Sequence, residues 1–253
     1  STPQSTNRQI RLLGGGALPG VNNTIDASGS TQQATLSFTH SGPNINLFDT
    51  PGARTLTLAG TNTGQNTFSI MLTDQAGGSS LTSLSKDGPG TWYILNSDNT
   101  YSGETFIRGG ILNVASVSDY GVPSSIGART FAQENSTLTG VSLHFLGGTL
   151  QYTGSTPQST NRNIRILNGF GATIDASGST PEATLSFTKT GPNINLFDTP
   201  GTRTLTLTGT NTGENGFSIQ LLDQAGNATS LLKTGDGTWV LNGPDSNTAT
   251  GAT

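Results

Sequence analysis

The chain has 253 residues, of which 31% are hydrophobic and only 10% are charged, both below the usual averages for globular proteins. Its 11 basic and 15 acidic residues give a net charge of −4, which excludes the basic patch that nucleic acid or an anionic membrane surface requires. The absence of cysteine excludes disulfides, zinc–thiolate sites and thiol chemistry.

Short segments of alternating apolar and polar residues predict β-strands throughout the chain. Each segment is rich in β-branched or aromatic residues and is bounded by Gly, Pro, Asn or Asp. No apolar stripe at i, i+3, i+4, i+7 is long enough to predict a helix. No run of apolar residues is long enough to predict a membrane-spanning segment. We therefore expect an all-β protein with strands, in chain order, at Arg8–Leu12, Ala34–Thr39, Thr55–Ala59, Phe68–Leu72, Trp92–Leu95, Thr105–Arg108, Ile111–Val114, Val141–Phe145 and Thr149–Tyr152.

Internal repetition is the strongest feature of the sequence. The segment Ser1–Leu13 returns as Ser155–Leu167 with 11 of 13 positions identical. Thr24–Gly77 returns as Thr173–Gly226 with 44 of 54 positions identical. Length differences between the copies fall in glycine-rich stretches, where loops tolerate them. We interpret the chain as tandem units of about 150 residues, with a first unit at 1–154 and a truncated second unit at 155–253.

Two all-β architectures fit short strands joined by tight turns: a sandwich or barrel, and a parallel β-helix. Gly, Thr, Ser and Asn together make up about half of the chain. Such small side chains suit the narrow core of a β-helix, and Thr, Asn and Ser form hydrogen-bonded ladders between its coils. We therefore favour a β-solenoid with coils of about 20 to 25 residues, so that one unit extends about 30–35 Å at about 4.8 Å per coil. Separate β-sandwich units are the alternative.

The stretch 87–114 reads DGPGTWYILNSDNTYSGETFIRGGILNV. It resembles the autotransporter-associated β-strand repeat, also called the passenger-associated transport repeat. The pattern of that family has three blocks: G-x-G-T-L-x-L, N-T-Y-[ST]-G-x-T and x-x-G-x-L-x-V. The corresponding blocks here, in the same order and spacing, are Gly88–Leu95, Asn99–Thr105 and Gly110–Val114.

The second copy starts the same motif at Gly235, but has Ala249 where the first copy has Tyr101. The resemblance implies a secreted passenger region, folded as a right-handed parallel β-helix on the outside of a bacterial cell. It also implies a role of the repeat in moving long passengers across the outer membrane. Members of the family are large surface proteins, proposed as adhesins or as structural surface material, so the resemblance implies no single ligand.

The two histidines of the chain give little support to catalysis. His40 has Lys189 as its counterpart in the second copy, an exchange that a catalytic base would not tolerate. His144 lies in the apolar segment VSLHF, where a ladder or surface role is more typical. No G-x-S-x-G turn marks a nucleophilic serine.

Clustered carboxylates deserve separate attention, because parallel β-helices include polysaccharide lyases and glycosidases. Asp26 and Asp175, in TIDASG, are the best candidates because each follows a strand segment, but no second acid and no calcium-loop spacing accompanies them. We therefore predict no catalytic, cofactor or metal site. The other repeated aspartates occupy positions where Asp bonds its own backbone in a turn: Asp49, Asp198, Asp74, Asp223, Asp87 and Asp236.

Trp92 and Trp239 recur at the same point of the unit, directly after Gly-Thr. Exposed tryptophans at this point could stack on sugars, but we favour a packing role in the solenoid core. Core positions are also expected for the repeated phenylalanines Phe38, Phe48, Phe68, Phe187, Phe197 and Phe217. Glycosylation sequons, a pattern common by chance in a chain so rich in Asn and Thr, occur at Asn22, Asn135 and Asn227.

The sequence thus predicts a non-enzymatic, extracellular structural repeat without a cofactor: a β-solenoid rod or filament segment of a long bacterial surface protein. Its expected partners are neighbouring repeats or other copies, which would pair the strand edges at the solenoid ends. An adhesin or glycan-binding passenger, with surface glycans as partners, is the alternative function. A β-helix enzyme that degrades polysaccharides is a third and weaker hypothesis.

Overall fold

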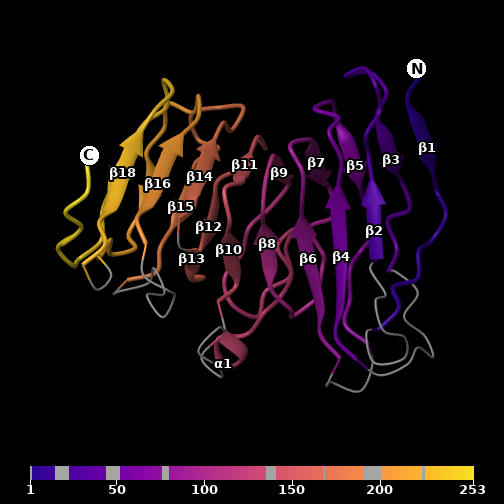
Figure 1. Cartoon of the computed structure of the whole chain (residues 1–253), viewed down its shortest axis with the longest axis horizontal. Helices are drawn as coiled ribbons and strands as arrows, with labels where there is room; N and C mark the ends of the chain where they lie inside the picture. Colours follow the sequence, from indigo (N-terminus) through magenta and orange to yellow (C-terminus); the bar gives the residue numbers. More distant parts are fainter. Residues whose placement is uncertain are drawn as a thin grey trace.

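The computed structural model describes residues 2–14, 23–43, 52–75, 80–134, 141–167, 169–190, 201–223 and 226–253. Over these residues the chain is a stack of short β-strands, joined by turns and by one four-residue helix, α1 (Phe131–Glu134). Figure 1 shows the strands side by side in rows along the longest axis, with the two ends of the chain at opposite ends of the molecule. The molecule is therefore elongated, and its length comes from the stacking of strands.

Three sheets run along this axis. Sheet A contains, in spatial order, β1 (Gln4–Thr6), β3 (Leu36–Phe38), β5 (Asn66–Phe68), β7 (Thr91–Ile94), β9 (Ile111–Val114), β11 (Thr149–Tyr152), β14 (Gly171–Ala176), β16 (Arg203–Thr208) and β18 (Thr229–Lys233). Sheet B contains β13 (Ile164–Ile166), β10 (Leu143–Phe145), β8 (Thr105–Ile107), β6 (Thr82–Lys86), β4 (Arg54–Ala59) and β2 (Asn23–Asp26). Sheet C contains β12 (Gln158–Thr160), β15 (Leu185–Phe187), β17 (Asn215–Phe217) and β19 (Trp239–Leu241).

Strands that follow each other in the chain lie in different sheets, so each coil visits one sheet after another before it returns to the first. Every pairing between the described strands is parallel. This arrangement is a parallel β-solenoid, which confirms the favoured prediction. A β-sandwich would be built on antiparallel pairs, so the alternative is wrong for the described residues.

The core lies between the sheets and follows from the two-residue alternation of each strand. In β4, Leu56 and Leu58 point inward and are buried, whereas Thr55 and Thr57 point outward. Aromatic rings stack from coil to coil in the same way. Phe187 and Phe217 are in register in sheet C with ring centroids 6.0 Å apart. Within the described residues, Phe38, Phe68, Phe187 and Phe217 all pack in the core as predicted, whereas Phe48 and Phe197 lie outside those residues.

Asparagine side chains bind the backbones of adjacent coils to each other. The Oδ1 atom of Asn66 accepts a hydrogen bond from the Leu36 amide at 2.9 Å, and its Nδ2 donates to the Thr91 carbonyl at 2.9 Å. Asn215, its counterpart in the second copy, makes the equivalent pair of bonds to neighbouring coils. Both asparagine side chains are fully buried, and these hydrogen bonds pair polar groups that would be costly to bury unpaired.

The coils are longer and less uniform than expected. Ile111 pairs with Thr91, 20 residues earlier, and with Thr149, 38 residues later. The prediction of 20 to 25 residues per coil is therefore wrong, because several coils carry long excursions between strands. The longest of these excursions contains α1.

Several strand positions also differ from prediction. Arg8–Leu12 contains no strand, whereas β1 lies four residues earlier. The predicted strand Phe68–Leu72 is replaced by β5, which ends at Phe68, and beyond it only Met71 forms an isolated bridge, to Pro43. The strands β2 and β6 and the helix α1 were not among the predicted elements.

Equivalent strands of the two copies lie in different sheets. In the first copy β2, β4 and β6 belong to sheet B, but their counterparts β14, β16 and β18 belong to sheet A. Likewise β3, β5 and β7 belong to sheet A, but β15, β17 and β19 belong to sheet C. The second copy is therefore displaced around the long axis by one sheet.

The displacement follows from the number of coils in the first copy. From β1 to its counterpart β12 the chain makes five returns to sheet A and then one further step into sheet C. At about 4.8 Å per coil, this unit extends about 26 Å, less than the 30–35 Å expected from shorter coils.

Substitution of Gly60 by alanine is expected to lower the free energy of unfolding by about 3 kcal/mol. Gly60 has a φ of 118°, and a Cβ atom there would lie 2.2 Å from the carbonyl oxygen of Ala27 in the coil before it. Urea denaturation would measure the loss. The matched control is Gly171→Ala, where the nearest atom to a Cβ, the Thr204 carbonyl oxygen, is 3.5 Å away. Equal midpoints for the two variants would contradict the close packing of the coils at Gly60.

Candidate functional site at the junction of the two copies

Charged side chains are scarce in this chain, yet several lie buried or half-buried together where the first copy meets the second. They come from the turn before β8, from the excursion that contains α1, from β10 and from the segment that leads through β13. We call this group the polar junction; its members are Glu104, Arg129, Glu134, His144, Arg162 and Arg165.

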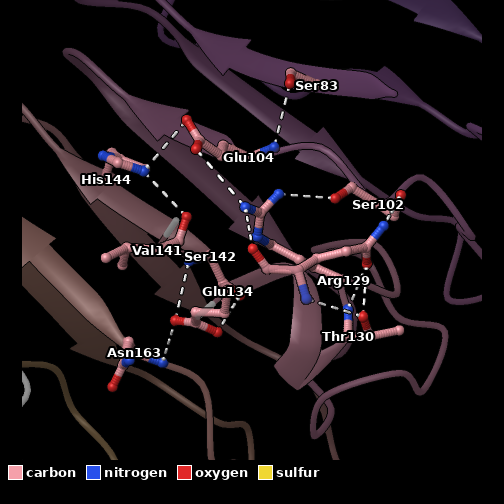
Figure 2. A network of polar contacts seen from close by, with 11 residues as sticks. Ser83, Ser102, Glu104, Arg129, Thr130, Glu134, Val141, Ser142, His144 and Asn163 are labelled. Atoms are coloured by element: carbon pink, nitrogen blue, oxygen red, sulfur yellow. Dashed lines mark hydrogen bonds and ion pairs between the residues drawn. The ribbon is translucent and has the colours of Figure 1, made fainter. Parts of the chain in front are cut away.

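The carboxylate of Glu104 faces two basic side chains from the neighbouring coil (Figure 2). Its Oε1 lies 3.8 Å from Arg129 Nη2, and its Oε2 lies 3.4 Å from His144 Nε2. Burial raises the pKa of Glu104, while the positive charges of Arg129 and Arg165 oppose that rise. Arg129 also donates to the Ser102 carbonyl at 2.9 Å, so it ties the α1 excursion to the turn before β8.

Glu134, the last residue of α1, is the most deeply buried acid of the junction, with 4% of its surface exposed. One carboxylate oxygen accepts hydrogen bonds from the backbone amides of Ser142 and Asn163, and the other accepts from the Ser142 hydroxyl at 3.0 Å. Burial raises its pKa, although these hydrogen bonds act in the opposite direction. Glu134 therefore joins α1 to β10 and to the segment before β13.

Ser142, His144 and Glu134 contain the side-chain types of a hydrolytic triad, but their hydrogen bonds do not form one. The Ser142 hydroxyl donates to Glu134, not to the histidine. His144 Nε2 lies 3.0 Å from the Val141 carbonyl, which can only accept, so this nitrogen carries the proton. The histidine therefore does not face the serine hydroxyl, as it would in a triad, and the hydrogen bonds of Glu134 join α1 to β10 and to the segment before β13.

Acidification is expected to destabilise the protein through His144. Burial, assisted by the charge of Arg165, lowers the pKa of His144 from 6.5 to about 4. Because the unfolded chain binds this proton at a higher pH than the folded one, the stabilisation is complete above pH 6.5 and is lost as pH falls towards 4, by about 1.4 kcal/mol per pH unit. The raised pKa values of Glu104 and Glu134 act in the opposite direction.

The variant His144→Phe isolates this contribution, since a phenylalanine can keep the ring contact with Phe106, at 4.8 Å between centroids. Urea midpoints of both proteins at pH 7.5 and pH 5 provide the test. The native protein should lose about 2 kcal/mol relative to the variant over this interval. A difference between the two proteins that stays constant with pH would contradict the assignment.

Arg162 forms the centre of the contact between the two copies. Its side chain is fully buried, and its three guanidinium nitrogens donate to five backbone carbonyls of one preceding segment. The distances lie between 2.7 and 3.2 Å, and the acceptors are the carbonyls of Ser118, Asp119, Val122, Ile126 and Gly127. We call residues 117–127 the carbonyl cup, because their backbone oxygens converge on this one guanidinium.

The residues before Arg162 extend the same contact. Gln158 accepts from the Val117 amide at 3.0 Å, and the Thr160 hydroxyl donates to the Ser118 carbonyl at 2.9 Å. Asn161 is bound twice, since its amide donates to the Asp119 carboxylate at 2.8 Å and its side-chain oxygen accepts from the Tyr120 amide at 3.0 Å. We call residues 158–162 the junction seat.

Other buried cations also bind backbone carbonyls. Lys86 Nζ donates to the carbonyls of Asp87, Gly88 and Gly109 at 2.8–3.0 Å. Burial lowers its pKa to about 8, with Asp87 opposing the shift. Lys233, its counterpart, keeps the two local acceptors but is exposed. The burial of Lys86 and Arg162 was not expected from the sequence.

The structure places the two tryptophans of the sequence analysis in the solenoid wall. The Trp92 ring is 1% exposed, and its Nε1 donates to the Ala59 carbonyl at 2.9 Å. Trp239 makes the equivalent bond to Thr208 but is only partly buried. A sugar has no access to the face of Trp92 in this arrangement.

The aspartates singled out in the sequence lie apart. Asp26 belongs to sheet B and Asp175 to sheet A, and each accepts from the serine hydroxyl two residues later. Asp74 does more than close a turn, because its carboxylate also accepts from the Ser102 amide in the next coil at 3.1 Å. Asp49 and Asp198, like the sequons at Asn22 and Asn135, lie outside the described residues.

Within the described ranges, no group of three or more His, Cys, Asp or Glu side chains could hold a metal ion. Nor does that part of the chain contain a helix long and apolar enough to cross a membrane.

Residues 84–114 and 231–253 match the family model of the passenger-associated-transport-repeat. Over 249 residues the chain is 39% identical to the Adhesin BmaC autotransporter of Brucella suis biovar 1 (strain 1330). That alignment covers 98% of this chain but 6% of the relative, so the chain spans only a small part of the relative's length. No solved structure is significantly similar to the chain.

Proposed function

We propose that this chain, an extracellular passenger-repeat segment of an autotransporter-type surface protein, acts as a stiff spacer whose repeating unit is 1–154. Such a segment would hold other parts of the protein at a distance from the cell. Its length would be set by the number of units, because each unit stacks only on its neighbours.

One observation carries this proposal: sheet A runs without interruption from the first copy into the second. Thr149 and Tyr152 of β11 pair with Thr173 and Ala176 of β14, so the backbone ladder crosses the boundary between the copies. Two separate domains joined by a linker would bend at this boundary, whereas a shared sheet with the buried polar junction beside it resists bending. Neighbouring units are thus the main partners in this proposal.

Electron cryomicroscopy of a protein with four tandem units would test the spacer function. We expect rods with an axial spacing of about 4.8 Å that lengthen by about 26 Å for every unit added. Beads joined by flexible segments, or a length that does not grow with unit number, would overturn the proposal.

The proposed segment is non-enzymatic. Asp26 and Asp175 lie on different sheets and cannot act as a pair of acids on one substrate. The test is turnover of acidic polysaccharides by the native chain and by Asp26→Asn and Asp175→Asn. Turnover that either substitution removes would establish the enzyme hypothesis instead.

Adhesion is a second candidate function, favoured by the similarity to an adhesin autotransporter and by one polar row on the outward side of sheet A. Asn113 Nδ2 donates to Gln151 Oε1 at 3.0 Å, and Gln151 Nε2 donates to Asp175 Oδ2 at 2.8 Å. The row therefore continues across the boundary between the copies. Gln151 and Asp175 are half-buried and would exchange these bonds for the hydroxyls of a surface glycan, whereas Asn113 is buried and only supports Gln151.

A glycan array would test the second candidate. Binding that Gln151→Ala removes, with an unchanged urea midpoint, would support the polar row. Binding that Trp239→Ala removes instead would support aromatic stacking at the half-buried tryptophan. No signal from the native chain on any glycan would leave the spacer as the function of this segment.

A further inference from the structure

The junction seat has an identical twin in the first copy. Residues 1–8 and 155–162 both read STPQSTNR. The local backbone turn is the same as well, because the amide of each arginine donates to the threonine hydroxyl two residues earlier at 3.2 Å, in the pairs Arg8–Thr6 and Arg162–Thr160. The first copy therefore presents the same donors on the same local fold.

The environments of the two seats differ. Thr160 and Arg162 are fully buried against the carbonyl cup. Gln4, Asn7 and Arg8 are exposed. Because the eight residues are identical, their own sequence cannot explain why one copy is buried and the other is exposed. The difference follows from the cup, which residues 117–127 supply only to the second seat.

We propose that Gln4–Arg8 is a second junction seat and that its partner is the carbonyl cup of another repeat, placed before it as the first copy is placed before the second. This inference rests on the proposed spacer, because it identifies what joins one unit to the next. The partner is recognised by its chemistry: five converging backbone carbonyls for the guanidinium, and an aspartate followed by a tyrosine for the asparagine.

The sheet arrangement agrees with this partner. β12 is the first strand of sheet C, and the cup residues Val117 and Ser118 cover it through Gln158 and Thr160. β1, its counterpart, is the first strand of sheet A. A preceding repeat displaced by one sheet would bring its own cup over β1 in the same way.

A longer protein, in which residues 1–154 are placed before the complete chain, would test the inference. The join then repeats the natural sequence in which Gly154 precedes STPQSTNR. Hydrogen exchange of the Asn7 amide directly after the join is the first readout, because its counterpart Asn161 donates to Asp119. We expect this amide to exchange at least about 100-fold more slowly in the longer protein than in the original chain.

The second readout is the urea midpoint of Arg8→Ala variants. In the original chain the substitution should leave the midpoint unchanged. In the longer protein, at the arginine after the join, it should lower the midpoint as much as Arg162→Ala does. Fast exchange of the Asn7 amide together with a neutral arginine substitution would overturn the docking.

Small-angle scattering would measure the length of the longer protein. This length distinguishes a wrong docking proposal from a wrong spacer proposal. A rod that is about 26 Å longer but has an inert Arg8 would refute the docking alone. A protein that has not lengthened would refute the spacer.

Discussion

Alanine in place of Arg162 is expected to lower the free energy of unfolding by about 4 kcal/mol. The substitution removes the guanidinium donors from five carbonyls around this fully buried group. The carbonyls of Ser118 and Gly127 keep a hydroxyl donor, and that of Asp119 keeps a backbone amide, so the cost falls mainly on the other two. Each buried carbonyl left without a donor costs about 1–3 kcal/mol, and entry of water into the vacated space recovers part of that cost. Urea denaturation, followed by circular dichroism, measures the effect.

Arg8→Ala is the matched control, because it changes the same residue in the same octapeptide at an exposed position. Its effect should stay within about 0.5 kcal/mol. Arg162→Lys should restore little, since one ammonium nitrogen cannot reach carbonyls that three guanidinium nitrogens span. Equal effects of the two alanine variants would show that the carbonyl cup adds nothing to stability.

Trp92→Ala is expected to cost about 4 kcal/mol, the usual range for a large aromatic residue in a core being about 3–5. The ring is fully buried between coils, and its removal leaves a cavity and takes one of two donors from the Ala59 carbonyl, which keeps the Ala27 amide. Urea denaturation measures the loss. Any glycan binding that the variant loses would therefore report unfolding and not a missing sugar contact.

Trp239→Ala serves as the comparison, since it removes the equivalent hydrogen bond from a half-buried ring. A smaller loss, about 1–2 kcal/mol, is expected because less apolar surface leaves contact with the core. If Trp92→Ala kept the native midpoint and yet abolished glycan binding, the stacking hypothesis would be right and the packing assignment wrong.

The sequence was most informative where side-chain pattern and repetition act locally. Alternation in RTLTLA predicted β4, and the G-T-W segment predicted β7. It failed where a strand depends on its neighbour. Arg8–Leu12 and its counterpart 162–166 share three of five residues and the same alternation, yet only the second contains a strand, β13, because β10 lies beside it as a partner. Pairing across coils is not encoded in either segment alone.

The polar junction could not be predicted from charge in the sequence. The excursion between β9 and β10 carries three of the 26 charged residues, Asp119, Arg129 and Glu134, which is no more than the average of the chain. What could not be seen is that Arg162 is buried while Arg8 is exposed, since their sequence context is the same. Lys86 was missed for a related reason: its three carbonyl acceptors come from two different coils.

Because the second copy is displaced around the long axis by one sheet, each unit of a longer array would be rotated about that axis relative to the unit before it. A patch on one unit would reappear a sheet further round on the next, and only the fourth unit would face the same direction as the first. Along any straight line on the rod, identical patches would then recur about every 78 Å. A flat partner, such as the surface of another cell, would meet one unit in three, whereas small soluble partners could occupy all of them.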